Sequence, residues 1–351
     1  MIQGVREVDG TAVRNGTSEK IRRLGASLAG AARKPMVMLV LLAVVGAVAF
    51  PAGVRAAGIQ WADLTLEQAL EKAAKEDRMV MVDVYSTHCG QCGELDEQVW
   101  DTPDGAALGQ DLIALRIESG APTSATLQKR YPILGLPAIL FLRPDGEELG
   151  RIVGYRSPAD FLDQANNLKS GIDPLPAAEA DLAAHPNSLP VLAEVMELYL
   201  YQKRQDDAKK LLDRIMELDT QHTSSDATRS LTMMAKYDEY FLGDYRASLP
   251  IWKSLVELYA SSVGVASGIQ GSLKIAVSWN QTADWIDWIC EIGEKHPDLG
   301  SLQYNIAIVS YHQGIRGHCL AEAARRAMAL GVGPSNMGSI ADALEGKPGP
   351  K

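Results

Sequence analysis

The chain has 351 residues, 46% of them hydrophobic and 22% charged, which is the composition of a soluble globular protein with room for two domains. Its net charge is −10, and the sequence beyond residue 60 contains no basic stretch, so nucleic-acid binding has no electrostatic support. The four cysteines are too few for a disulfide scaffold in a chain of this length.

Residues 1–57 have the layout of a secretory signal. A cationic flank that ends at Arg33 and Lys34 precedes an apolar run over 36–50, and small residues follow at 56–58. The apolar run is shorter than the ~20 residues that a membrane-spanning helix needs. We therefore expect a signal peptide and export to the periplasm. The alternative is an N-terminal membrane anchor, in which residues 36–50 tether the protein to the inner membrane.

Residues 58–170 alternate between helical and strand patterns. A first helix is predicted over 65–75, because Thr65 and Gln68 fit a capping box and apolar residues recur at helical spacing. The elements that follow are a strand (79–85), the cysteine-containing helix (89–99), a turn (101–105), a strand (112–117) and a helix (124–131). After them come a strand (137–142), a turn (143–146), a strand (149–155) and a helix (157–168). This order predicts an α/β domain whose mixed sheet is covered by helices on both faces.

The rest of the chain is predicted to be helical. Residues 171–176 are predicted to be a linker, and in 177–345 Ala, Leu and Met recur at helical spacing. Similar stretches begin at Tyr201, Tyr240 and Trp279, with a period of 39 residues. Each lies between two helical patterns, which is typical of an α-solenoid. The pattern resembles degenerate tetratricopeptide repeats, and this resemblance implies an all-α helical-repeat (TPR-like) domain.

The tetrad Cys89-Gly90-Gln91-Cys92 follows the apolar strand and opens a helix. Two thiols three residues apart on a first helical turn can close a small disulfide ring, and a helix N-terminus stabilises a thiolate. We therefore predict a redox-active disulfide, with Cys89 as nucleophile and Cys92 as resolving thiol. Haem attachment is disfavoured because Gly93 stands where a His is required. A zinc site would need two more ligands, of which His88 could supply one, so neither a metal nor a cofactor is predicted.

Two further residues belong to the predicted site. Asp83 lies six residues before Cys89 inside the apolar strand, where a carboxylate is costly unless it has a role. If Asp83 lies beneath the cysteines, burial would raise its pKa and the carboxylate would take the proton of Cys92. The alternative is an exposed position of Asp83 at the end of the strand. Pro137 begins a core strand, and the bond from Leu136 to Pro137 is a candidate cis peptide that leaves the Leu136 backbone for an extended substrate segment.

Residues 59–170 resemble a thioredoxin-fold domain, in particular the periplasmic C-terminal domain of DsbD-type reductases and their stand-alone relatives. The motifs that carry the resemblance are 82–92, 134–141, 145–146 and 154–155. The resemblance implies that Cys89 attacks, Cys92 resolves, Asp83 assists proton transfer and Pro137 is the cis-proline of the substrate groove. His88 stands where many family members have Trp, and it either stabilises the thiolate by charge or is a solvated side chain.

The helical region contains other candidate residues. Cys290 and Cys319 fall on helices of adjacent repeats and are predicted to be two buried thiols, with a structural disulfide as the alternative. His312, His318 and Cys319 are a weak candidate for a metal cluster. The tail 346–351 is predicted to be disordered. The tryptophans of this region are assigned to the repeat core rather than to a ligand site: Trp279, Trp285 and Trp288.

Together these features predict an exported thiol–disulfide oxidoreductase. Its expected partners are substrate proteins with cysteines or disulfides, a redox partner protein that could be membrane-bound, and a protein bound at the helical repeats. One alternative is a non-catalytic adaptor, in which the thioredoxin fold serves only for docking. Another is a metal-delivery protein that uses His88, Cys89 and Cys92.

Overall fold

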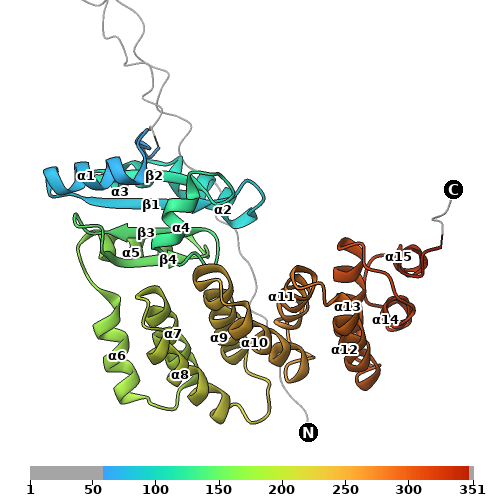
Figure 1. Ribbon diagram of the computed structural model, residues 1–351. Helices are drawn as coiled ribbons and strands as arrows, with labels where there is room; N and C mark the ends of the chain where they lie inside the picture. Colours follow the sequence, from blue (N-terminus) through green and yellow to red (C-terminus); the bar gives the residue numbers. More distant parts are fainter. Residues whose placement is uncertain (1–57, 348–351) are drawn as a thin grey trace, which may run out of the picture. The chain divides into compact units, whose positions relative to one another are not determined.

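The computed structural model describes residues 58–347, and the predicted signal or anchor at 1–57 lies outside them. Residues 58–169 contain a four-stranded sheet with helices, and the helical region follows (Figure 1). No helix among residues 58–347 has the length and apolar character needed to cross a membrane. The elements of the first part are α1 (Leu66–Glu76), β1 (Met79–Tyr85), α2 (Gly90–Leu95), the π-helical segment η1 (Asp96–Trp100), α3 (Pro103–Gly109), β2 (Leu112–Glu118), α4 (Ser124–Arg130), β3 (Ala138–Leu142), β4 (Glu148–Val153) and α5 (Pro158–Lys169).

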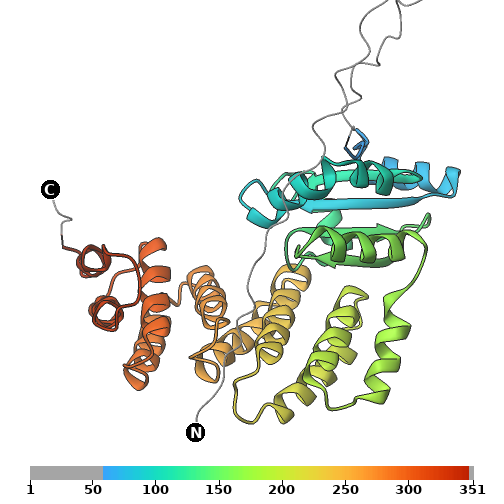
Figure 2. The same cartoon turned by 180° about the vertical axis from the view of Figure 1, so that it is seen from behind.

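The sheet has the strand order β2-β1-β3-β4, in which β1 is parallel to β2 and antiparallel to β3. Successive side chains of a strand point to opposite faces. Val80 and Val82 therefore pack with α1 and α4, whereas Met81 packs with η1, α3 and α5. Figure 1 shows α1 and α4 in front of the sheet, and Figure 2, from behind, shows α3 and α5 in front. The predicted mixed sheet with helices on both faces is confirmed.

Local signals explain most of these elements, with one exception. The predicted capping box is present, because the Thr65 side chain accepts from the Gln68 N–H and the Gln68 side chain accepts from the Thr65 N–H. The predicted turn at 101–105 is wrong, since α3 begins there. Thr102 caps α3 and Pro103 occupies its first turn, so residues that are typical of a turn are equally typical of a helix start.

The helical region begins earlier than the sequence indicated. The first helix starts at Pro174, inside the predicted linker 171–176, because the Asp173 side chain accepts from the Leu175 N–H and caps it. The elements are α6 (Pro174–Ala184), α7 (Leu189–Tyr201), α8 (Gln205–Leu218), α9 (Ser225–Lys236), the π-helical segment η2 (Tyr237–Leu242), α10 (Tyr245–Glu257), α11 (Val265–Ser278), α12 (Thr282–Lys295), α13 (Gly300–His312), α14 (His318–Ala329) and α15 (Met337–Leu344).

The 39-residue period corresponds to equivalent places in consecutive helix pairs. Tyr201 ends α7, Tyr240 lies in η2 directly after α9, and Trp279 follows α11. The turns after them each contain a residue with positive φ: Lys203, Gly243 and Asn280. Of the tryptophans assigned to the repeat core, Trp285 is buried, whereas Trp279 is 38% exposed and lies outside the core.

Cys290 on α12 and Cys319 on α14 are joined in a disulfide, with their Cα atoms 5.8 Å apart. The prediction of two buried thiols is therefore wrong, and its alternative is correct. The contact between α12 and α14 brings together two residues that are 29 positions apart. A helical pattern alone does not determine that Cα separation.

Candidate functional site

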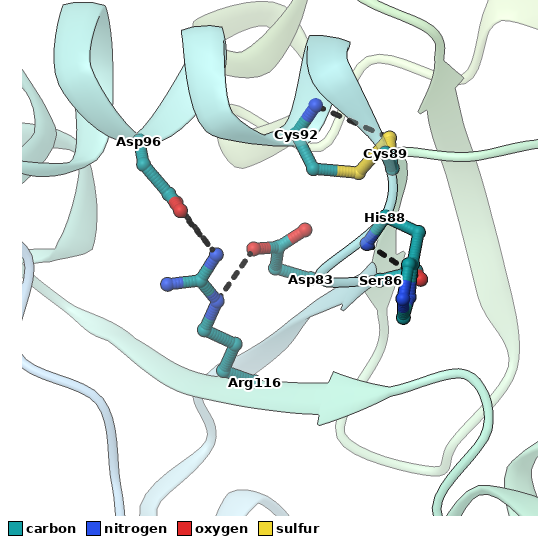
Figure 3. The surroundings of a disulfide bond; sticks show 7 residues. All are labelled: Asp83, Ser86, His88, Cys89, Cys92, Asp96 and Arg116. Atoms are coloured by element: carbon teal, nitrogen blue, oxygen red, sulfur yellow. Dashed lines mark hydrogen bonds and ion pairs between the residues drawn. A yellow bond between two sulfur atoms is a disulfide. The ribbon is translucent and has the colours of Figure 1, made fainter.

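Cys89 and Cys92 are joined in a disulfide at the start of α2 (Figure 3). Cys89 is the N-cap residue of this helix, and its Sγ accepts a hydrogen bond from the Cys92 N–H at 3.2 Å. Cys89 is half-buried, whereas Cys92 is 3% exposed. An incoming group therefore reaches the first sulfur more easily than the second, and the N–H groups of the helix start stabilise negative charge on that first sulfur.

Asp83 lies beneath this disulfide in the centre of β1. It shares the face of Met81, so its carboxyl points toward α2, and Figure 3 shows it between the disulfide and Arg116. The side chain is 1% exposed. This burial raises the pKa of Asp83 to about 7, although the positive charge of Arg116 acts in the opposite direction. The alternative of an exposed strand end is wrong.

Arg116 and Asp96 complete the charged group, and the sequence prediction missed both. Arg116 lies opposite Asp83 in the parallel pairing of β1 with β2, and its Nε is 3.3 Å from the Asp83 carboxylate. Its Nη2 donates to both carboxylate oxygens of Asp96, at 2.6 and 2.8 Å. The guanidinium also lies over the Tyr85 ring, 4.0 Å from its centroid. The available signal was a cation inside the otherwise apolar stretch 112–117.

We expect Arg116→Gln and Asp96→Asn to move the pKa of Asp83 in opposite directions. Removal of Arg116 takes away the cation that favours the Asp83 carboxylate, so the pKa should rise above about 7. Removal of the Asp96 charge should lower it, because Asp96 repels that carboxylate. Carboxyl carbon shifts of Asp83 across pH 4 to 9 measure both effects. The control is Arg143→Gln on the β3–β4 turn, and shifts in the same direction for both variants would contradict the arrangement.

The segment around Pro137 is linked to the tetrad through Gly154, which pairs with Pro137 and lies near the Gln91 side chain. The peptide bond from Leu136 to Pro137 is cis, as predicted, and Pro137 directly precedes β3, whose Ala138 pairs with Val84 of β1. The Pro137 carbonyl accepts from the Gly154 N–H at 2.9 Å. A Cβ atom at Gly154 would lie 3.6 Å from the Gln91 side chain, so this segment borders the tetrad. The substrate-binding role of Leu136 and Pro137 stays a prediction.

His88 is exposed and precedes the first cysteine. Its Nδ1 is 3.3 Å from the Thr87 hydroxyl, and its backbone N–H donates to the Ser86 hydroxyl at 3.2 Å. In Figure 3 the ring points away from the sulfur atoms. This geometry is that of a solvated side chain, and an effect of His88 on the thiolate stays a prediction.

The metal cluster suggested for His312, His318 and Cys319 is not formed. Cys319 is bonded to Cys290, and His312 and His318 line different hollows. Within residues 58–347, the group of side chains that could hold a metal is His318, Glu322 and Glu345. Arg325 forms ion pairs with both carboxylates of this group, and Lys347 pairs with Glu345 as well, so the two negative charges that would attract a cation are already balanced.

Residues 66–169 match the family model described as a thioredoxin-like domain. The thiol:disulfide interchange protein DsbD of Klebsiella pneumoniae is 33% identical over 100 residues, which cover 27% of this chain and 16% of the relative. DsbD 2 of Pseudomonas aeruginosa is 33% identical over 101 residues, which cover 28% and 17%. The chain thus spans less than a fifth of the length of these curated relatives.

Two solved structures are each similar to about a third of the chain. A thioredoxin from Thermus thermophilus has 28% identity and a TM-score of 0.30, and the match covers 33% of this chain and 92% of that one. The oxidised C-terminal domain of DsbD from Neisseria meningitidis has 22% identity and a TM-score of 0.27, over 31% and 97%. On the family match and the observed sheet, residues 66–169 are a thioredoxin-like domain, and an all-helical region follows it.

Proposed function

We propose that the protein is an exported thiol–disulfide oxidoreductase that exchanges electrons with the cysteines of substrate proteins. The observation that carries the proposal is the Cys89–Cys92 disulfide at a helix start, directly above the buried carboxyl of Asp83. Two-step exchange requires an accessible sulfur that attacks the substrate and a second sulfur that releases it. This disulfide joins an accessible sulfur to a buried one, and a proton acceptor lies beneath them. The DsbD relatives are named thiol:disulfide interchange proteins, which agrees with this activity.

The exchange proceeds through a mixed disulfide. In the dithiol form, the Cys89 thiolate attacks one sulfur of a substrate disulfide, and the other substrate sulfur leaves as a thiolate. Asp83 then takes the proton of Cys92, whose sulfur attacks Cys89 and releases the second substrate thiolate. Two electrons have moved from the protein to its substrate, and the Cys89–Cys92 disulfide is closed. The same steps in reverse oxidise a substrate dithiol, and no cofactor is needed because the two sulfurs carry the electrons.

The helical region would serve as a protein-interaction platform. It would form a second domain, which begins with α6 at Pro174 and extends to 345, after a thioredoxin-like domain over 58–170. Its consecutive helix pairs support this role, because stacked pairs create extended surfaces for a partner. A redox partner protein, either free or held in the membrane, would restore the dithiol. Export to the periplasm is supported by the signal-like pattern of residues 1–57 and suits a site that works as a disulfide.

Redox titration of the full chain tests the proposal. We expect one reversible two-electron couple that belongs to Cys89 and Cys92, between roughly −120 and −300 mV, the span of thioredoxin-like proteins. Mass spectrometry after thiol alkylation at each potential assigns the couple to its cysteines. The absence of a reversible couple in that range would remove the enzymatic function and leave the adaptor alternative.

A further inference from the structure

A lysine of the helical region contacts the segment that carries the cis-proline. Lys236, the last residue of α9, donates from its ammonium to the Leu134 carbonyl at 3.0 Å. Leu134 lies three residues before Pro137, and its side chain is packed in the core cluster of helices α6 to α11. The helical region is therefore directly adjacent to the segment that borders the tetrad.

The ammonium of Lys236 retains unused bonding capacity. A lysine has three donors, and the Leu134 carbonyl occupies one of them. Within residues 58–347 no carboxylate lies within ion-pair distance of this ammonium. Burial lowers the pKa of Lys236, because desolvation disfavours its charged form. An incoming carboxylate would therefore gain more from this half-buried cation than from a fully hydrated one.

Lys236 lines a hollow of about 600 Å³ that continues along the helical region. The other walls come from η2, α10, α11 and α13, and include Tyr240, Lys274, Asn305 and His312. Among the described residues, none that lines it is acidic, although the chain as a whole has a net charge of −10. Lys274 is already paired with the buried Glu239 at 2.6 Å, so the unbalanced positive charge is that of Lys236.

We propose that this hollow is a docking subsite for an acidic segment of the substrate protein, and that Lys236 binds one of its carboxylates. The inference rests on the proposed function. Lys236 also holds the Leu134 carbonyl, close in sequence to the cis-proline. When an acidic segment of a substrate binds to Lys236, the substrate residues next to that segment therefore lie beside the cis-proline segment, where Cys89 attacks. The three residues from Leu134 to Pro137 span at most ~10 Å, so the acidic segment would lie a few residues from the reacting cysteine.

Single-turnover reduction of two synthetic peptides tests the proposal. Each peptide contains one intramolecular disulfide. In the first peptide a run of glutamates flanks the disulfide on each side, and in the second a run of glutamines does so. We expect the dithiol form of the full chain to reduce the glutamate peptide about tenfold faster at low substrate concentration, which corresponds to ~1.4 kcal/mol. Lys236→Met should abolish this preference, Lys236→Arg should retain it, and added salt should reduce it.

Lys210→Met on α8 is the matched control, since it removes the same charge from an exposed residue that does not line the hollow. It should leave the preference unchanged. If Lys236→Met slows both peptides equally, Lys236 only holds the Leu134 carbonyl and the subsite is overturned. If wild type reduces both peptides at the same rate, the subsite fails while the exchange function stands. If wild type reduces neither peptide, both proposals fail.

Discussion

Cys92→Ser should convert the protein into a trap that remains covalently bound to its substrates. Cys89 can still attack a substrate disulfide, but the thiol that would release the mixed disulfide is missing. The complexes should appear on non-reducing gels of periplasmic extracts and disappear after reduction. Mass spectrometry of the trapped partners would then identify the substrates. Cys89→Ser should form no such complexes and should lose exchange activity by roughly a thousandfold or more.

The chain contains its own control for this experiment. Cys290 and Cys319 form the second disulfide, on helices α12 and α14. Replacement of both by serine in the Cys92→Ser background should leave the trapped complexes unchanged. Trapping by Cys89→Ser instead of Cys92→Ser would reverse the assigned roles. Complexes that depend on Cys290 or Cys319 would move the exchange site to the helical region.

The sequence predicted features that depend on neighbouring residues. The position of the tetrad at 89–92 at a helix start was predictable, because an apolar strand and a short loop directly precede it in the sequence. Asp83 was identifiable because a carboxylate in an apolar strand is unusual, and the alternation of the strand places it on the α2 face. The cis-proline could be predicted for a similar reason, since few positions in a core strand accept proline.

Features that depend on distant parts of the chain were missed. Arg116 meets Asp83 only through the register between β1 and β2, which are joined through α2, η1 and α3. The contact of Lys236 with Leu134 joins residues 102 positions apart. The disulfide on α12 and α14 likewise depends on how two helices pack. Periodicity determines which face of an element is buried, but not which residues of another element meet that face.

Asp83→Asn should stabilise the oxidised protein, and the gain should grow as the pH rises from about 4 to 7. The folded state keeps the Asp83 proton up to about pH 7, whereas the unfolded chain releases it near the ordinary value of 3.8. The folded state thus binds more protons in this window, so the stability of wild type falls as the pH rises through it. The full effect, above pH 7, corresponds to about 4 kcal/mol. Asparagine has no proton to lose and avoids this cost.

Urea unfolding at several pH values measures the effect as the difference in free energy between variant and wild type. Asp163→Asn on α5 is the control, because it removes the same charge from an exposed carboxylate outside the site. A difference for Asp83→Asn that stays constant from pH 4 to 8 would contradict a buried, neutral Asp83.

The same substitution should slow closure of the Cys89–Cys92 disulfide. Without the carboxylate, Cys92 must lose its proton to water or hydroxide, and a positioned base typically accelerates such a step about a hundredfold or more. The deficit should be largest near pH 7 and should narrow at higher pH, where hydroxide removes the proton. Stopped-flow measurement of closure against pH tests this. A carboxylate that destabilises the fold but accelerates closure is retained for function, and a variant that is both more stable and equally fast would exclude that role for Asp83.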